Sequence, residues 1–281
     1  MDVYLDCLPC SLRQALEASR MATDNSELHG KIMADSAALL QSYNKFTNAP
    51  EICREVHRIV KEHTGNRDPY KDIKKKDIET ALALMPSLKR FVDVNHDRLY
   101  RAFKAAAMGN MLDSSIVSSF NFETCFEAEL NKPFSVYDIE PFEQKLKTAK
   151  SLLVIADNAG ETVFDCIMLN EFPELDITYA VRSVPILNDA TEEEARASGI
   201  EAYARIIPSG SDVPGTILNE CTKEFLDIFN TADIVISKGQ GNYETLSDCS
   251  RDIFFLLKAK CAVVSNLLAV DLNGYVFLYK K

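Results

Sequence analysis

A chain of 281 residues, 47% of them apolar, is long enough to bury a substantial core in one large domain or two smaller ones. Its net charge of −11 and pI near 5.0 argue against nucleic acid as a partner, although a local basic pocket for a small phosphate is compatible with them. No window approaches the apolar length needed to cross a bilayer, and the first residues lack a signal-peptide pattern, so we expect neither a membrane partner nor export.

Eight cysteines are scattered along the chain, most of them within apolar helix or strand patterns. Cysteine in such positions acts as a small apolar residue, which predicts a reduced, cytoplasmic protein. Cys7 and Cys10 form a lone C-x-x-C motif. A structural zinc site would need two more ligands, for which Cys53 and His57 are candidates, but buried cysteines without a metal are the favoured interpretation.

The first 135 residues predict a region built of helices. Apolar residues recur with a helical period and few glycines interrupt them. Helix ends are predicted at Thr64-Gly65-Asn66, near Met85-Pro86 and at Gly109-Asn110. The basic run Lys74-Lys75-Lys76 predicts a solvated helix face.

From residue 136 to residue 281 the pattern changes to strands that alternate with helices. Strands are expected at or near 151–156, 176–181, 203–207, 233–236, 261–265 and 275–279. The alternation predicts an α/β fold with a mostly parallel, Rossmann-like sheet and helices on both of its faces. Because no low-complexity linker separates the two regions, we expect the helical N-terminal region (1–135) to pack against the α/β catalytic domain (136–281).

Polar side chains follow the first buried strand of this domain. Asp157, Asn158 and Gly160 come directly after residues 151–156. Ligands of parallel sheets bind beyond the carboxyl ends of the strands, and adjacent carboxylate and carboxamide oxygens suit a divalent cation. An Asx turn explains this pair equally well when it is taken alone.

The next three strand ends are also rich in polar residues and glycine. Arg182 and Asn188-Asp189 follow the second strand, residues 208–215 follow the third, and Lys238-Gly239-Gln240-Gly241-Asn242 follow the fourth. Asp189 could instead begin the next helix, and Lys238-Gly239 could be a solvated turn. The coincidence of four such ends at one sheet edge favours a functional site.

The chemistry of these loops fits a metal-dependent phosphoryl site. Asp157, Asn158 and Asp189 would supply two carboxylates and an amide carbonyl, enough for an octahedral cation that completes its shell with water and a substrate phosphate. The ammonium group of Lys238 and nearby backbone N–H groups could hold phosphate oxygens.

Histidine is absent from all of these loops. Catalysis would therefore rest on charge neutralisation by a metal and Lys238, with either a metal-bound water or Asp157 attacking phosphorus. The sequence leaves both routes open. The four histidines all fall in the helical region: His29, His57, His63 and His96.

Six motifs resemble those of the damage-control phosphatase family, formerly catalogued as DUF89, and they extend over essentially the whole chain. They are Cys7-Leu-Pro-Cys10-Ser-Leu-Arg-Gln14, Thr64-Gly-Asn-Arg-Asp-Pro-Tyr70, Gly109-Asn-Met-Leu-Asp113, Asp157-Asn-Ala-Gly-Glu161, Pro185-Ile-Leu-Asn-Asp-Ala-Thr191 and Lys238-Gly-Gln-Gly-Asn-Tyr-Glu244. The N-terminal C-x-x-C is similar to that of prokaryotic subfamily I.

The resemblance implies a metal-dependent phosphatase that acts on small phosphorylated metabolites such as sugar phosphates or damaged phosphometabolites. It implies a metal at Asp157, Asn158 and Asp189, with manganese, cobalt or nickel favoured and magnesium possible. It also places Lys238 at a phosphate-binding position. Five further residues are candidates for substrate binding: Asn110, Asp113 and Glu161, together with Arg182 and Asn242 from the strand ends.

Two other functions stay open. One is a protein that binds a phosphometabolite without turnover. The other is a carboxyl methyltransferase that uses S-adenosylmethionine, an assignment that some eukaryotic relatives carry. Such cofactor sites usually need a glycine-rich turn after the first strand and an acidic residue at the end of the second. Here one glycine follows the first strand and Arg182 ends the second, so we favour a metal-dependent phosphomonoester hydrolase.

Overall fold

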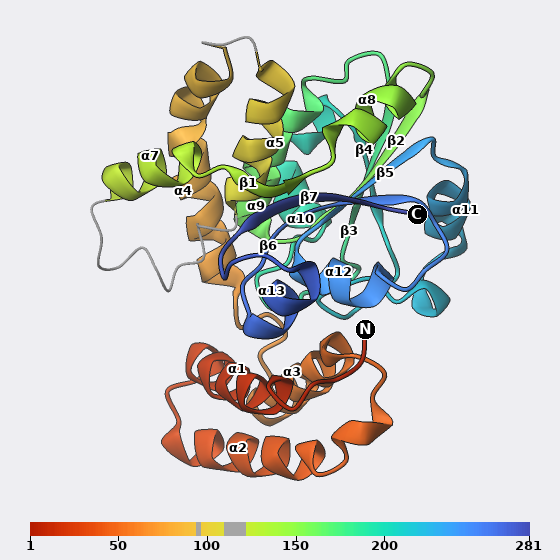
Figure 1. Cartoon of the computed structure of the whole chain (residues 1–281). Coiled ribbons are helices and arrows are strands. Elements are labelled where there is room, and N and C mark those ends of the chain that lie inside the picture. The colour runs from red at the N-terminus through yellow and green to blue at the C-terminus, as the bar shows by residue number, and fades with distance from the viewer. Residues whose placement is uncertain (94–96, 110–121) are drawn as a thin grey trace.

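The computed structural model describes residues 1–93, 97–109 and 122–281. A seven-stranded sheet lies at the centre, in the order β1-β7-β6-β5-β2-β3-β4, and every neighbouring pair is parallel except β6 with β7 (Figure 1). The strands are β1 (Phe134–Tyr137), β2 (Ser151–Ile155), β3 (Asp176–Val181), β4 (Arg205–Pro208), β5 (Ile234–Lys238), β6 (Ile253–Lys258) and β7 (Tyr275–Lys280).

Helices precede the sheet in the chain and connect most of its strands. They are α1 (Cys7–Ala22), α2 (Ser26–Leu40), α3 (Ala49–Thr64), α4 (Lys71–Asp93), α5 (Arg98–Met108), α7 (Phe122–Asn131), α8 (Ile139–Leu146), α9 (Ala159–Leu169), α10 (Glu192–Ala197), α11 (Lys223–Thr231), α12 (Gln240–Leu246) and α13 (Ala262–Leu268). Within the described parts of the chain, none of these helices combines the length and apolar character that a bilayer-spanning segment needs.

The strand β2 is buried on both of its faces, which explains its uninterrupted apolar sequence. Leu152 and Val154 pack into the core that includes α4, α5 and α9, whereas Leu153 and Ile155 pack into the core that includes α11, α12 and α13. A strand covered on both sides has no solvated face that would require polar side chains. The predicted α/β fold with a mostly parallel sheet is therefore confirmed.

One strand prediction is wrong, and one strand was not predicted. The strand expected over 261–265 is wrong, because these residues form the start of α13, where the Cys261 side chain accepts the N–H of Val264 and caps the helix. The strand of this segment lies earlier, at β6, where all six residues are buried. The sequence reading also missed β1, a short edge strand that pairs with β7.

The helix ends were predicted with mixed success. The end of α3 at Gly65 is confirmed, and the φ of 70° at this glycine is the left-handed cap that stops the helix. The end near Met85-Pro86 is wrong, since α4 continues through Pro86 to Asp93. Proline in a helix interior costs a backbone hydrogen bond, but Leu88 and Val92 beyond it are buried in the core and hold the last turns in place.

The prediction of a solvated lysine run holds only in part. Lys75 is exposed, but the Lys74 side chain is 1% exposed. Its ammonium group lies 2.7 Å from a carboxylate oxygen of Asp68 and 2.7 Å from one of Glu194. This pairing links α4 to the segment that precedes it and to α10.

Helices α1, α2 and α3 form a separate layer with its own apolar clusters, shown in red and orange at the bottom of Figure 1. Polar contacts join this layer to loops that follow β3 and β4. Arg54 forms ion pairs of 2.7 Å with Asp212 and with Glu220, and the ammonium group of Lys61 donates to the carbonyl of Pro185. The layer therefore packs against the carboxyl edge of the sheet.

His57 makes the stability of this helical layer sensitive to acid. The side chain is 1% exposed, its Nδ1 lies 2.9 Å from the carbonyl of Cys53, and burial lowers the pKa of His57 to about 4. Because the pKa is lower in the folded protein than in the unfolded chain, stability is lost as the pH falls from 6.5 towards 4, by about 3 kcal/mol in total. Urea unfolding of wild type and His57→Phe at pH 7 and pH 4 measures this loss.

We expect His57→Phe to remove most of this pH dependence while lowering stability at pH 7, because the bond to Cys53 is lost. His29→Phe serves as the control for loss of a histidine elsewhere, since His29 is only partly buried. An unchanged difference between the two pH values in His57→Phe would contradict the assignment.

Candidate functional site

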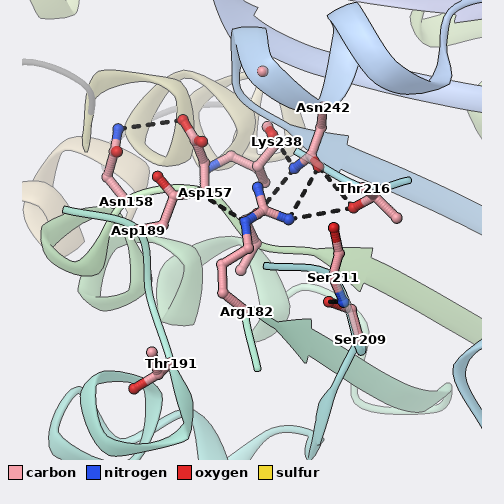
Figure 2. Close-up of polar contacts among 12 residues, drawn as sticks. Asp157, Asn158, Arg182, Asp189, Thr191, Ser209, Ser211, Thr216, Lys238 and Asn242 are labelled. Atoms are coloured by element: carbon pink, nitrogen blue, oxygen red, sulfur yellow. Dashed lines mark hydrogen bonds and ion pairs between the residues drawn. The ribbon is translucent and has the colours of Figure 1, made fainter. Parts of the chain in front are cut away.

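A backbone bridge joins the loops that follow β2 and β3. Asn158 and Asp189 pair as an isolated antiparallel bridge. The N–H of Ala159 donates to the carbonyl of Asn188, and the N–H of Ala190 donates to the carbonyl of Asp157, both at 2.8 Å. Three side chains predicted to hold a metal, those of Asp157, Asn158 and Asp189, therefore lie together at the carboxyl edge of the sheet (Figure 2).

The amide of Asn158 is held in one orientation. Its Nδ2 donates to Asp157 Oδ2 at 3.2 Å and to Glu161 Oε1 at 2.7 Å, so both amide hydrogens are used. Although Asn158 is the N-cap of α9, its side chain makes no capping hydrogen bond. Among the described residues, Oδ1 has no hydrogen-bond partner. An Asx turn therefore does not account for this residue.

The carboxylate of Asp189 is oriented by a buried arginine. Arg182 Nε donates to Asp189 Oδ2 at 2.7 Å, and Arg182 Nη1 donates to the side-chain oxygens of Thr216 and Asn242 at 3.2 Å each. Arg182 Nη2 is buried without a partner among the described residues. The N-cap of α10 is Thr191, not Asp189, so the alternative of a simple helix start does not describe this carboxylate.

Lys238 is completely buried, and all three of its N–H groups are used. Its Nζ lies 2.8 Å from Asp165, 2.9 Å from Glu161 and 3.2 Å from the carbonyl of Ala106. Burial disfavours the charge of this lysine, but the two carboxylates outweigh it and raise the pKa of Lys238. The alternative of a solvated turn at this lysine is therefore wrong.

These contacts form one chain of hydrogen bonds from Tyr179 to Asn158. The hydroxyl of Tyr179 donates to Asp165 at 2.6 Å, Asp165 accepts from Lys238, and Lys238 donates to Glu161. Glu161 in turn accepts from Asn158. Each buried charge in the chain has a partner, as buried charges require.

The electrostatics of the edge favour a cation. Burial raises the pKa of Asp157 well above its usual range, and the neighbouring carboxylates of Glu161 and Asp189 raise it further. Burial also raises the pKa of Asp189, with Arg182 offsetting part of the effect. Carboxylates brought together in a dry site repel each other, and a divalent cation relieves that repulsion.

The oxygen donors fit a hard or borderline cation, and the cysteines do not form a metal site. Throughout the described ranges, no group of three or more His, Cys, Asp or Glu side chains is placed to hold a metal ion. The structure therefore gives no support to the zinc hypothesis for Cys7, Cys10, Cys53 and His57. The set of two carboxylates and one amide oxygen at Asp157, Asn158 and Asp189 remains as the candidate.

The other predicted site residues are distributed unevenly. Glu161 and Arg182 lie at the site through the contacts above, and Asn242 accepts from Arg182 while its Nδ2 donates to the carbonyls of Ala156 and Lys238. Asn110 and Asp113 lie outside the described residues.

Sequence reasoning missed Asp165, Tyr179 and Thr216. A signal existed for Asp165, which stands four residues after Glu161 and so on the same face of α9. No comparable signal marked Tyr179 or Thr216.

The fold and the site together define an α/β protein with an oxygen-rich centre at the carboxyl edge of its sheet. Residues 3–276 match the family model of the damage-control phosphatase ARMT1-like domain, and the chain belongs to that family.

Relatives extend over the whole chain. It is 32% identical over 287 residues to a damage-control phosphatase of Pyrococcus horikoshii, covering 100% of this chain and 99% of the relative. It is 33% identical to an uncharacterised protein of Methanocaldococcus jannaschii, covering 97% and 94% of the two chains. A crystal structure of a DUF89 family protein from Pyrococcus horikoshii superimposes with a TM-score of 0.91 at 33% identity and covers 100% of both chains.

Gly239 allows the Asp157 carboxylate to approach the start of α12. Its φ of 80° and ψ of 166° suit glycine alone, and a Cβ at this position would lie 2.0 Å from Asp157 Oδ2. We expect Gly239→Ala to lower the free energy of unfolding by at least about 2 kcal/mol, because of both backbone strain and the clash. Urea unfolding measures the change.

Gly30→Ala is the matched control. Gly30 lies inside α2, and a Cβ there would meet nothing within 4 Å. This substitution should stabilise the protein by up to about 1 kcal/mol. If both variants changed stability equally, the close approach of Asp157 to Gly239 would be contradicted.

Proposed function

We propose that this protein is a metal-dependent phosphatase that hydrolyses small phosphorylated metabolites. Two relatives carry the name damage-control phosphatase, and they align with this chain over nearly its full length. The observation that carries the proposal is the meeting of Asp157, Asn158 and Asp189 at one sheet edge, with the amide of Asn158 turned so that Oδ1 is left for a ligand.

Asp157, Asn158 and Asp189 would hold the divalent cation in this proposal. Oxygen ligands of this kind accept manganese and magnesium, and cobalt and nickel also fit a mixed carboxylate and amide set. When bound, the metal supplies charge neutralisation for a phosphate group and for the oxygen that attacks it. All three residues fall within the range that the family model matches.

The protein's own residues orient the substrate and the ligands. Arg182 Nη2, buried and without a partner among the described residues, offers one donor for a phosphate oxygen. Asp157 is the catalytic carboxylate, and its Oδ2 is held by the amide of Asn158. Lys238 is predicted to contact phosphate, but its three N–H groups are engaged, so it would have to give up one bond to do so.

Metal-dependent release of phosphate is the direct test. We expect p-nitrophenyl phosphate to be hydrolysed in the presence of manganese, cobalt or nickel, and Asp157→Asn and Asp189→Asn to lower kcat by roughly 100-fold or more, because each removes a charge from the cation site. Phosphate release is measured across a metal panel with purified protein.

Asp227→Asn provides the control for this experiment. Asp227 lies on the surface of α11 and pairs only with the exposed Lys223 in the described structure, so its replacement should leave kcat unchanged. Silence of the wild type with every metal, together with binding of a phosphorylated ligand without its consumption, would instead support a non-catalytic binding protein.

Asp165 is expected to act as a positioning residue for the cation site. In Asp165→Asn, Lys238 loses one of the two carboxylates that fix its ammonium group, so this group can shift and displace Glu161, and through it Asn158. Outer partners of metal ligands typically contribute 10- to 100-fold to metal affinity, so we expect the Kd for manganese to rise by roughly tenfold. Calorimetric titration with manganese measures it without reliance on turnover.

Tyr179→Phe is the graded comparison, because it removes only the hydroxyl that donates to Asp165. We expect a smaller rise in the manganese Kd than in Asp165→Asn. Unchanged manganese affinity in a folded Asp165→Asn protein would show that the hydrogen-bond chain does not position Asn158.

A further inference from the structure

A second charged group lies beside the catalytic edge and takes no part in the contacts above. We name it the Lys104 cluster, and it consists of Lys104, Glu129, Lys132, Lys258 and Tyr275. Glu129 accepts a hydrogen bond from the Tyr275 hydroxyl and lies 3.2 Å from the ammonium group of Lys258. The ammonium groups of Lys104 and Lys132 lie 3.1 Å and 5.9 Å from the centre of the Tyr275 ring.

Lys104 is unusual because its amine is buried and finds no hydrogen-bond acceptor within the described ranges. The residue is 0% exposed, and its Nζ has no hydrogen-bond partner among the described residues. The face of the Tyr275 ring offers a cation–π contact, but no oxygen of the described residues accepts from the amine. Burial lowers the pKa of Lys104 to about 7, which reflects the cost of keeping a charge there.

Counted over the described residues, the cluster holds more positive than negative charge. Three lysines surround a single carboxylate, that of Glu129, whose two hydrogen-bond donors in the described structure are Lys258 and Tyr275. Burial also lowers the pKa of Lys258. A buried cation without a partner is destabilising, so the contacts that the described residues make with Lys104 do not by themselves account for it. A further anion at this place would satisfy it.

The cluster adjoins the candidate catalytic site. Lys104 stands two residues before Ala106 on α5, and the carbonyl of Ala106 accepts from Lys238. Lys258 ends β6, two residues after Leu256, which pairs with Lys238 in the sheet. Lys260 stands two residues after Lys258 in the chain. Its charge lowers the pKa of Asp157 and of Asp189, against the rise that burial causes.

We propose that the Lys104 cluster is a subsite for a second anionic group, a carboxylate or a phosphate, carried by the substrate apart from the phosphate that is removed. The proposal rests on the proposed phosphatase function. Lys132 is half-buried and the Lys258 side chain is 11% exposed, so Lys132 and the end of Lys258 would meet the anion first, while Lys104 attracts it from within the protein. The carboxylate of Glu129 already shows that the cluster binds this kind of group.

The substrate class follows from the two charge patterns. The cation held by the acidic side chains would bind the phosphate that is cleaved. The lysines of the Lys104 cluster would bind the other acidic group. Phosphorylated sugar acids and bisphosphates meet both requirements, whereas a neutral sugar carrying one phosphate meets only the first. Charge-assisted bonds from ammonium groups to carboxylate or phosphate are strong enough to select between them.

A matched pair of probes tests this selection. Glycerol 3-phosphate and 3-phosphoglycerate have three carbons each, and only the second carries a carboxylate. We expect the wild type to have a KM for 3-phosphoglycerate at least fivefold lower than for glycerol 3-phosphate. Lys104→Met should raise the KM for 3-phosphoglycerate by about tenfold, while the KM for glycerol 3-phosphate and both kcat values change less than twofold.

Stability provides an independent readout on the same variant. Because methionine has a similar length and needs no hydrogen bond, Lys104→Met should raise the Tm by a few degrees, in contrast to the loss expected at a structural residue. Lys258→Met should also raise the KM for 3-phosphoglycerate. This second variant keeps the test possible if Lys104→Met does not fold. Lys75→Met, exposed on α4, is the control that should change neither quantity.

Calorimetry with both probes, on metal-free full-length protein, separates this proposal from the phosphatase proposal. If no metal supports turnover but 3-phosphoglycerate binds more tightly than glycerol 3-phosphate and loses this advantage in Lys104→Met, the subsite stands and the phosphatase function fails. Binding of inorganic phosphate that persists with saturating glycerol 3-phosphate and weakens in Lys104→Met supports the site with a free anion as its ligand. The proposal is overturned if the wild type binds both probes with equal affinity. It is also overturned if Lys104→Met and Lys258→Met each change the affinity for the two probes by the same factor.

Discussion

The backbone bridge between Asn158 and Asp189 is the contact on which the candidate site depends. The two residues stand 31 positions apart in sequence, and α9 and β3 lie between them. Parallel pairing of β2 with β3 brings their carboxyl ends to one edge, and beyond the strands a separate antiparallel bridge joins the two loops. The loops are therefore held by main-chain bonds, so the carboxylates can be brought close together without relying on favourable side-chain contacts.

The repulsion between those carboxylates is destabilising, and neighbouring cationic side chains reduce it. Arg182 balances Asp189, and Lys238 balances Glu161 and Asp165. Asp157 forms no ion pair in the described structure, and its only side-chain hydrogen bond comes from the neutral amide of Asn158. A buried carboxylate left in this state is destabilising, and such residues are found where a ligand restores the balance. The arrangement is consistent with a cation as that ligand.

Much of this could be predicted from sequence because the relevant signals are local. The apolar run 151–156 and its polar end identified β2 and its loop, and the same pattern identified the loop that contains Asp189. The burial of Lys238 could not be predicted, because it depends on two carboxylates from α9 and a carbonyl from α5. The short edge strand β1 and the passage of α4 through Pro86 depend on long-range packing in the same way.

The two charged groups at the carboxyl edge have opposite signs and adjoin each other. Among the residues that the structure places, Asp157 has no cationic partner on one side, and on the other side three lysines surround the one carboxylate of Glu129. The helix α5 connects them, since Ala106 contacts Lys238 and Lys104 lies within one turn of it. A protein selected for stability alone would pair these charges with each other, because unlike charges a short distance apart attract strongly in a medium of low dielectric constant. Their separation is retained at a cost in stability, which is the usual property of a site that binds a ligand with its own complementary charges.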